Sequence, residues 1–186
     1  MYNHPDYIAK QNKGQTLFTD SVWPLICEPL GADRLETVEG TPSGLHLDLM
    51  GIDHWIHYGK QKYGVGARVW SRSLRSFDQT YPFISVRRQT TRPMTEYHAR
   101  VHTAMTNSPT SDLTVESFIT ETYIHVIWVR TKQLWQTYLD YYDTDYKFQT
   151  FTIGKNERQA TFLMFDWPWL VDNQLVRGCI KHRRTK

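Results

Sequence analysis

The most constraining feature of the sequence is a pair of β-rich segments separated by a short polar turn. Residues 46–58 place apolar side chains at near-alternating positions, interrupted near Gly51, and residues 63–70 read YGVGARVW. Alternating apolar residues on both sides of a turn predict two antiparallel strands. We therefore expect a β-hairpin in the first half of the chain, and a core that is built on a sheet.

The rest of the chain alternates between helical and strand patterns. Apolar residues three to four positions apart predict helices over residues 16–30 and 131–142, with Pro24 in the first turn of the first helix or bending it. Helix-forming residues after Pro93 predict another helix over residues 95–106. Strands are expected over residues 82–88, 113–120, 123–130, 148–153 and 160–165, and residues 31–44 read as a loop or short strand. This order predicts an α/β or α+β fold, a mixed central sheet flanked by helices.

The length of the chain predicts one domain. With 186 residues and 22.1 kDa, it divides into an N-terminal tail over 1–13, a single domain over 14–176 and a basic C-terminal tail over 177–186. The apolar runs are far shorter than the roughly 18 to 20 residues of a membrane span. The N-terminus has no apolar stretch of signal-peptide length. We therefore expect a cytoplasmic protein without a membrane partner.

Basic charge is concentrated at the C-terminus. The net charge is +3, but the last ten residues contain five cations and no acid. Such a segment can contact phosphates, and it can equally be a solvated end of the chain. The five cations are Arg177, Lys181, Arg183, Arg184 and Lys186.

The hairpin carries the strongest candidate for chemistry. Asp53 lies in the first predicted strand and Arg68 in the middle of the second. An acid beside a cation on neighbouring strands suits a metal-dependent nuclease, because the carboxylate holds a divalent cation and the guanidinium stabilises charge on the phosphate. The alternative is a salt bridge across the hairpin with a structural role.

These residues belong to short motifs that resemble the PD-(D/E)XK, or restriction-endonuclease-like, nuclease superfamily. The motifs are GID at 51–53, GVGARVW at 64–70, TEYHAR at 95–100 and VRTK at 129–132, and the resemblance covers roughly residues 16–142. In that superfamily a helix precedes a strand with an Asp, and the next strand carries Glu or Gln, one residue, then Lys. The resemblance implies a restriction-endonuclease-like fold of a degenerate phage or mobile-element type, with Asp53 as a ligand of Mg²⁺.

The sequence departs from that pattern at two positions. Gly66 stands where the second acid belongs, and Arg68 replaces the Lys. Because Mg²⁺ is usually held by one or two carboxylates, a second acid is needed. Glu96 is the best candidate, since helical spacing puts Glu96 and Arg100 on one face, and superfamily members let this acid move to the following helix. An ordinary surface pair of Glu96 and Arg100 is the alternative, and the other candidate acids are Glu39, Asp48 and Glu116.

Other chemistries have little support in the sequence. His54 and His57 would point to opposite faces of a strand and so cannot share a zinc ion. Cys27 and Cys179 are far apart and have no metal-binding spacing, so we expect reduced, partly buried thiols. The tryptophans at 167 and 169, in FDWPWL, could stack a nucleobase beside the basic tail, or belong to the core or to a protein interface.

The sequence thus predicts a metal-dependent, endonuclease-like protein that acts on or binds DNA, a Mg²⁺-dependent phosphodiesterase. Asp53 and Glu96 are the expected metal ligands and Arg68 the cation that stabilises the phosphate. The alternative, favoured by Gly66, is a catalytically silent nuclease-fold protein of a mobile element that binds a protein partner. The oligomeric state stays open, a homodimer included. The residues expected to bind nucleic acid are Arg100, Arg177, Lys181, Arg183 and Arg184.

Overall fold

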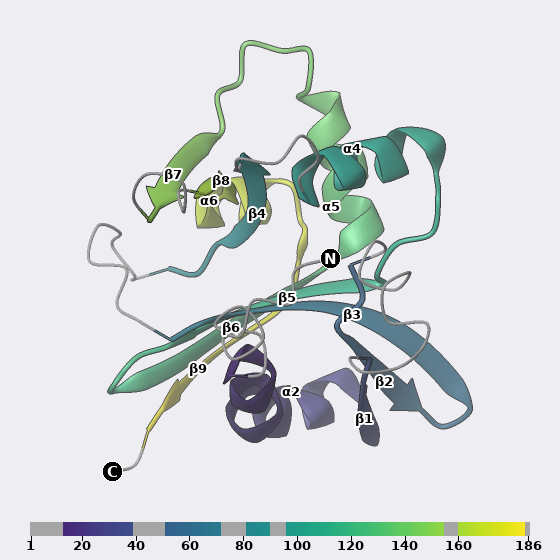
Figure 1. Ribbon diagram of the computed structural model, residues 1–186, viewed down its shortest axis with the longest axis vertical. Helices are drawn as coiled ribbons and strands as arrows, with labels where there is room; N and C mark the ends of the chain where they lie inside the picture. Colours follow the sequence, from purple (N-terminus) through teal and green to yellow (C-terminus); the bar gives the residue numbers. More distant parts are fainter. Residues whose placement is uncertain (1–12, 39–50, 72–80, 90–95, 155–159, 185–186) are drawn as a thin grey trace.

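The computed structural model of the protein describes residues 13–38, 51–71, 81–89, 96–154 and 160–184. These residues form three layers (Figure 1). A helical N-terminal segment lies against one face of a large, central sheet. The opposite face carries a smaller sheet together with the remaining helices.

The large sheet has six strands in the order β1-β2-β3-β5-β6-β9. Its pairs are antiparallel except for β3 and β5, which run parallel. The predicted hairpin is therefore confirmed as β2 and β3, although β2 is shorter than expected and residues 46–50 lie outside the described chain. The strands are β1 (Arg34–Thr37), β2 (His54–Tyr58), β3 (Gln61–Trp70), β5 (Leu113–Ile119), β6 (Tyr123–Arg130) and β9 (Val176–Arg183).

A second, antiparallel sheet has the strand order β4-β8-β7. It shares its side of the large sheet with three helices (Figure 1). The prediction of a mixed α/β protein with a sheet flanked by helices is confirmed, but the predicted strands are divided between two sheets. The elements of this layer are β4 (Ile84–Gln89), β7 (Gln149–Ile153), β8 (Ala160–Phe165), α4 (Glu96–Thr106), α5 (Thr131–Asp140) and α6 (Trp167–Asp172).

The N-terminal helical segment covers the other face of the large sheet. It passes through a π-helical stretch, η1 (Phe18–Val22), into α2 (Trp23–Leu30), and Pro24 lies in the first turn as predicted. Gly31 ends α2 in the left-handed conformation that glycine adopts without strain. Phe18, Val22 and Ile26 are buried here, in one cluster with the apolar residues of β2, β3, β5 and β6.

The core on the opposite face is rich in aromatic side chains. It includes Tyr97 from α4, Trp135 and Tyr138 from α5, Phe165 from β8 and Trp169 from α6. Rings in this group meet mostly edge to face, as for Trp135 and Phe165 at a centroid distance of 5.7 Å. These aromatic side chains, which could have bound a ligand, are therefore used in packing.

The segment predicted as a basic C-terminal tail is a strand over most of its length. Val176–Arg183 forms β9, which pairs with β6 at the edge of the large sheet. Val176 and Ile180 pack against the core, while Arg177 and Lys181 are exposed. The expected domain boundary at residue 176 is therefore wrong. The segment was predicted as a tail because of its cations, but cations are also typical of edge strands, where charged side chains discourage pairing with further strands.

No helix among the described residues is long and apolar enough to cross a membrane.

Candidate functional site: a charged cluster between the two sheets

Strand alternation places the candidate residues on one face of the large sheet. On β3, Val65 and Ala67 pack toward the N-terminal helices, so Arg68 and Trp70 face the smaller sheet. On the parallel strand β5, Glu116 is the register partner of Arg68. An acid and a cation on neighbouring strands thus meet between the two sheets.

Glu116 connects the two sheets through hydrogen bonds. Its carboxylate is fully buried. The backbone N–H of Ser85, on β4, donates to Oε2 at 2.6 Å, and the Ser85 hydroxyl donates to Oε1 at 2.5 Å. The indole N–H of Trp70 donates to the same Oε1 at 2.5 Å. Three donors therefore depend on one carboxylate that has no access to water.

Arg68 adds helix α4 to this network. Its Nη1 donates to the backbone oxygen and to the hydroxyl of Ser85, at 2.7 and 3.1 Å. Its Nη2 donates to Oε2 of Glu96 at 2.5 Å, in an ion pair whose side chains are 22% and 33% exposed. Both side chains of this ion pair are therefore half-buried. We refer to Asp53, Arg68, Ser85, Glu96, Arg100 and Glu116 as the charged cluster.

Asp53 approaches the cluster from the start of the hairpin. It directly precedes β2, and its Oδ2 accepts a hydrogen bond from the backbone N–H of Ala67 at 2.7 Å. Its charge lies near enough to Arg68 to raise the pKa of the guanidinium. The structure therefore brings together Asp53, Arg68 and Glu96, the three residues predicted from sequence to carry chemistry.

Arg100 is a second cation of the cluster, and it is buried. Its Nη1 donates to the Thr110 hydroxyl at 2.7 Å, and its Nη2 to the backbone oxygen of Gly51 at 3.4 Å. The side chain therefore ties α4 to the loop before β5 and to the start of the hairpin. Glu96 and Arg100 do not form the exposed surface pair that was the alternative.

Burial and the neighbouring positive charges shift the pKa values of the cluster's glutamates in opposite directions. Burial raises the pKa of Glu116 to about 7, although Arg68 and three hydrogen bonds favour its charged form. Burial also acts to raise the pKa of Glu96, but the charges of Arg68 and Arg100 bring it below the usual value. The environment therefore favours the ionised form of Glu96 and shifts Glu116 toward its protonated form.

Gly66 occupies the position where the resemblance leads one to expect a second acid. A Cβ atom at this position would lie 2.7 Å from the backbone oxygen of Gly51 and 3.8 Å from Nη2 of Arg100. Gly51 itself has a φ of +67°, and a Cβ there would overlap the Arg100 guanidinium. The space next to Gly66 thus holds a backbone carbonyl and a cation.

Replacing Gly66 with alanine is expected to lower the free energy of unfolding by about 1–3 kcal/mol, because the new methyl group overpacks against a backbone atom that cannot move freely. Urea denaturation measures this difference. Gly14→Ala is the control, because a Cβ there meets nothing within 4 Å. Equal stability of Gly66→Ala and wild type would mean that an acid side chain also fits at this position.

The other residues predicted to bind nucleic acid lie away from the cluster. Arg177, Lys181 and Arg183 are on β9, and β5 and β6 separate this strand from β3. Arg177 donates to Gln133 of α5, and Arg184 donates from Nη1 to the backbone oxygen of Thr120 at 2.9 Å. Glu39 and Asp48, the remaining candidate acids, lie outside the described residues.

The histidines and cysteines behave largely as the sequence suggested. His54 is buried and stacks on Phe18 at a ring distance of 4.5 Å, whereas His57 points to the other face and contacts Glu36. Both Cys27 and Cys179 are free thiols, but Cys179 is exposed rather than partly buried. Within the described residues no group of three His, Cys, Asp or Glu side chains is arranged to hold a metal ion.

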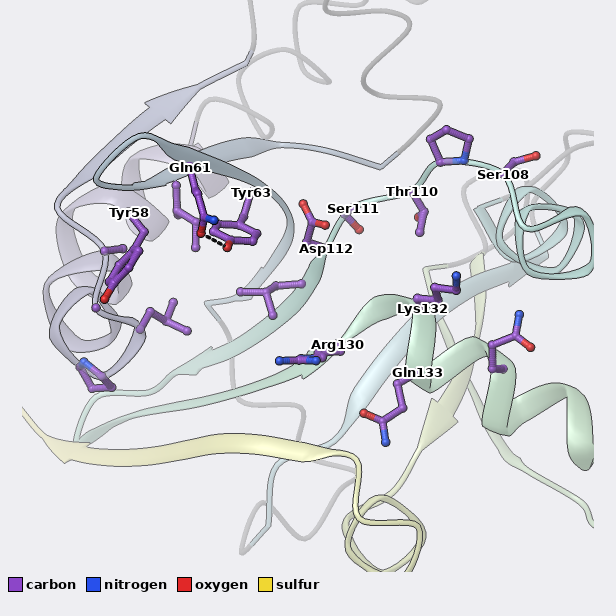
Figure 2. A pocket seen from close by; sticks show the side chains of 18 of the residues that line it. Tyr58, Gln61, Tyr63, Ser108, Thr110, Ser111, Asp112, Arg130, Lys132 and Gln133 are labelled. Carbon is purple, nitrogen blue, oxygen red and sulfur yellow. Dashed lines mark hydrogen bonds between the residues drawn. The ribbon is translucent and has the colours of Figure 1, made fainter.

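A large cavity of about 1290 Å³ adjoins the cluster on the far side of the loop before β5. Figure 2 shows Tyr58, Gln61 and Tyr63 on one side of it and Lys132 and Gln133 on the other. Thr110, which accepts the hydrogen bond from Arg100, also lines this cavity. The lining includes both acids and bases, so its charge does not select an anionic or a cationic ligand.

Comparison of the chain with protein-family models, with curated proteins and with solved structures gives no match.

Proposed function

We propose that the protein is a nuclease-like domain that acts on DNA, with the charged cluster as its site. The observation that supports this most strongly is the ion pair of Glu96 with Arg68, beside Asp53, whose Oδ2 accepts from the N–H of the residue that precedes Arg68. A helix precedes Asp53 in the chain, with β1 between them, and the next strand of the hairpin carries the cation. A nuclease-like protein of this type is expected in the cytoplasm.

The residues present are of the right chemical kind for Mg²⁺. Asp53 and Glu96 offer carboxylate oxygens, the ligands that this ion prefers, and water and phosphate oxygens would complete its coordination. When bound, Mg²⁺ supplies a Lewis acid that polarises the phosphate and an activated water. Arg68, which is partly exposed, can exchange Glu96 for a phosphate oxygen and stabilise the additional negative charge of the transition state.

A second candidate function is a catalytically silent nuclease-like protein that binds a protein partner. The specific observation in its favour is the surroundings of Gly66, where the backbone oxygen of Gly51 leaves no room for the Cβ atom that an acid would need. Arg68 and Arg100 together place two positive charges beside Asp53 and Glu96. Such charges oppose the binding of a divalent cation.

Cleavage of DNA distinguishes the two functions. Single-stranded, duplex and branched DNA are incubated with the full chain in Mg²⁺ or Mn²⁺, with Asp53→Asn as the test variant. Asparagine can still accept the hydrogen bond from Ala67, so the fold is retained while the charged ligand is lost. We expect wild-type cleavage and a loss of about 100-fold or more in the variant, the effect of removing several kcal/mol of charge stabilisation.

Asp143→Asn, at an exposed acid remote from the cluster in sequence, is the matched control and should cleave like wild type. Thermal unfolding of both variants verifies that they fold. Absence of wild-type cleavage on all three substrates in both metals would contradict the nuclease proposal and favour the silent protein.

A further inference from the structure

A small cavity of about 220 Å³ opens on the face of the large sheet that also carries the charged cluster. It lies between the segment leading into β4, the end of β5, the start of β6 and strand β9. The residues that line it include Tyr81, Phe83, Phe118, Tyr123, His125 and Lys181.

Aromatic rings form the floor and the rim of this cavity. Phe83 and Phe118 are buried and in contact, with ring centroids 4.7 Å apart. Tyr81 and Tyr123 remain 59% and 38% exposed. Tyr81 stacks on Trp167 at 5.9 Å with an interplanar angle of 16°. One of the two tryptophans predicted to stack a base, Trp167, thus supports a tyrosine at the rim, while Trp169 is buried in the core.

Positive charge borders the same cavity. The Nζ atom of Lys181 lies 5.0 Å from the centre of the Tyr123 ring. Arg183 is the register partner of Tyr123, and Arg184 is held at the rim through its hydrogen bond to Thr120. The described residues that line the cavity include no Asp or Glu. The large cavity of Figure 2, by contrast, has Glu28 and Asp112 in its lining.

We propose that this cavity binds one unpaired nucleobase of single-stranded DNA, stacked on the exposed tyrosines, with a neighbouring phosphate on Lys181. Aromatic platforms beside cations are the means by which proteins bind single strands without sequence preference. A protein partner would not require exposed tyrosines together with a lysine in a lining that, among the described residues, holds no Asp or Glu. The exposed Glu121 stands between Thr120 and Thr122 in the chain but does not line the cavity. This inference rests on the proposed action on DNA and specifies which form of DNA is bound and where.

The cavity is connected to the charged cluster through two segments of the chain. Phe118 follows Glu116 by two residues on β5, and Phe83 precedes Ser85 by two residues. Two residues of a strand span roughly 7 Å. A base held against Phe83 and Phe118 therefore lies about two strand residues from Glu116 and Ser85, the members of the cluster that join the two sheets.

Binding of a fluorescent oligothymidylate, followed by anisotropy in EDTA, tests the proposal without any metal-dependent step. Tyr81→Ala is expected to weaken binding by about 5- to 150-fold, the range for the loss of one stacked base. Lys181→Ala should reduce the slope of log K against log salt by about 0.7, the value for one phosphate contact on a single strand. Tyr58→Ala and Lys132→Ala are the matched controls, because they remove an exposed tyrosine and an exposed lysine from the large cavity.

Crosslinking of an oligonucleotide that carries 5-iodouracil should modify Tyr81 or Tyr123. Equal affinities of Tyr81→Ala and Tyr58→Ala would overturn the proposal, as would tighter binding of duplex than of single-stranded DNA, or thymidine monophosphate binding as tightly as the oligonucleotide. If the binding of single-stranded DNA in EDTA depends on Tyr81 but no DNA is cleaved in the presence of metal, the base-binding site is supported and the nuclease proposal is contradicted.

Discussion

Replacing Glu116 with alanine is expected to lower the free energy of unfolding by about 3–5 kcal/mol, the range for removing one partner of a buried charged network. The substitution leaves the N–H and the hydroxyl of Ser85 and the indole N–H of Trp70 without their acceptor. Each unsatisfied buried donor costs about 1–3 kcal/mol. Arg68 also loses one of the acids that stabilise its charge.

Urea denaturation measures this effect, and two further variants assign it. Glu116→Gln retains the size of the side chain and one acceptor oxygen, so it should destabilise the protein less than alanine does. Glu121→Ala, at an exposed acid in the turn between β5 and β6, should be almost neutral. A loss of less than about 1 kcal/mol in Glu116→Ala, the net value of a single ordinary hydrogen bond, would mean that Glu116 does not join the two sheets.

The elements of this fold were predictable where local periodicity decides them. Strands β3, β5 and β6 and helix α5 follow from the pattern of their apolar residues, and helix α4 from its helix-forming residues after Pro93. The division of the strands between two sheets was not predictable, because the choice of strand partners depends on contacts distant in sequence. Helix α6 was missed although a local signal exists: Asp166 accepts from the N–H of Trp169 as an N-cap, and Pro168 lies in the first turn.

The candidate site was predictable in part, again where local periodicity decides the structure. Strand alternation and the hairpin turn were sufficient to pair Asp53 with Arg68, and helical spacing pointed to Glu96. Glu116 was only one of several further acids, since its role depends on the smaller sheet covering β5. The signal that could have selected it is an acid enclosed by apolar residues in the strand LTVESFI, where a charge is costly unless it has partners.

Two buried groups with large pKa shifts, Glu116 and His54, are expected to give opposite pH dependence to stability. Burial raises the pKa of Glu116 from 4.5 to about 7, so between these values the folded state keeps a proton that the unfolded state has lost. The contribution of Glu116 to stability is therefore complete below pH 4.5 and is lost as the pH rises through 7.

The titration of His54 has the opposite effect on the pH dependence of stability. Burial lowers its pKa from 6.5 to about 4, so the unfolded state gains a proton below pH 6.5 that the folded state does not take up. Stability therefore rises with pH between 4 and 6.5. Each shift corresponds to about 3 kcal/mol over its range, at 1.36 kcal/mol per pKa unit. The two contributions largely cancel in the wild-type protein, because their pH ranges overlap.

Variants at each position should separate the two contributions. Relative to wild type, Glu116→Gln is expected to make stability rise more steeply between pH 4.5 and 6.5, because only the histidine effect remains. His54→Phe, which keeps an aromatic ring against Phe18, should make stability fall with pH over the same range. Urea denaturation at several pH values gives the difference curves, in which the effects of all other titrating groups cancel. If the stability of both variants changed with pH in the same way as that of the wild type, each group would have the same pKa in the folded and unfolded states. That result would contradict the burial of Glu116 in the network between the two sheets.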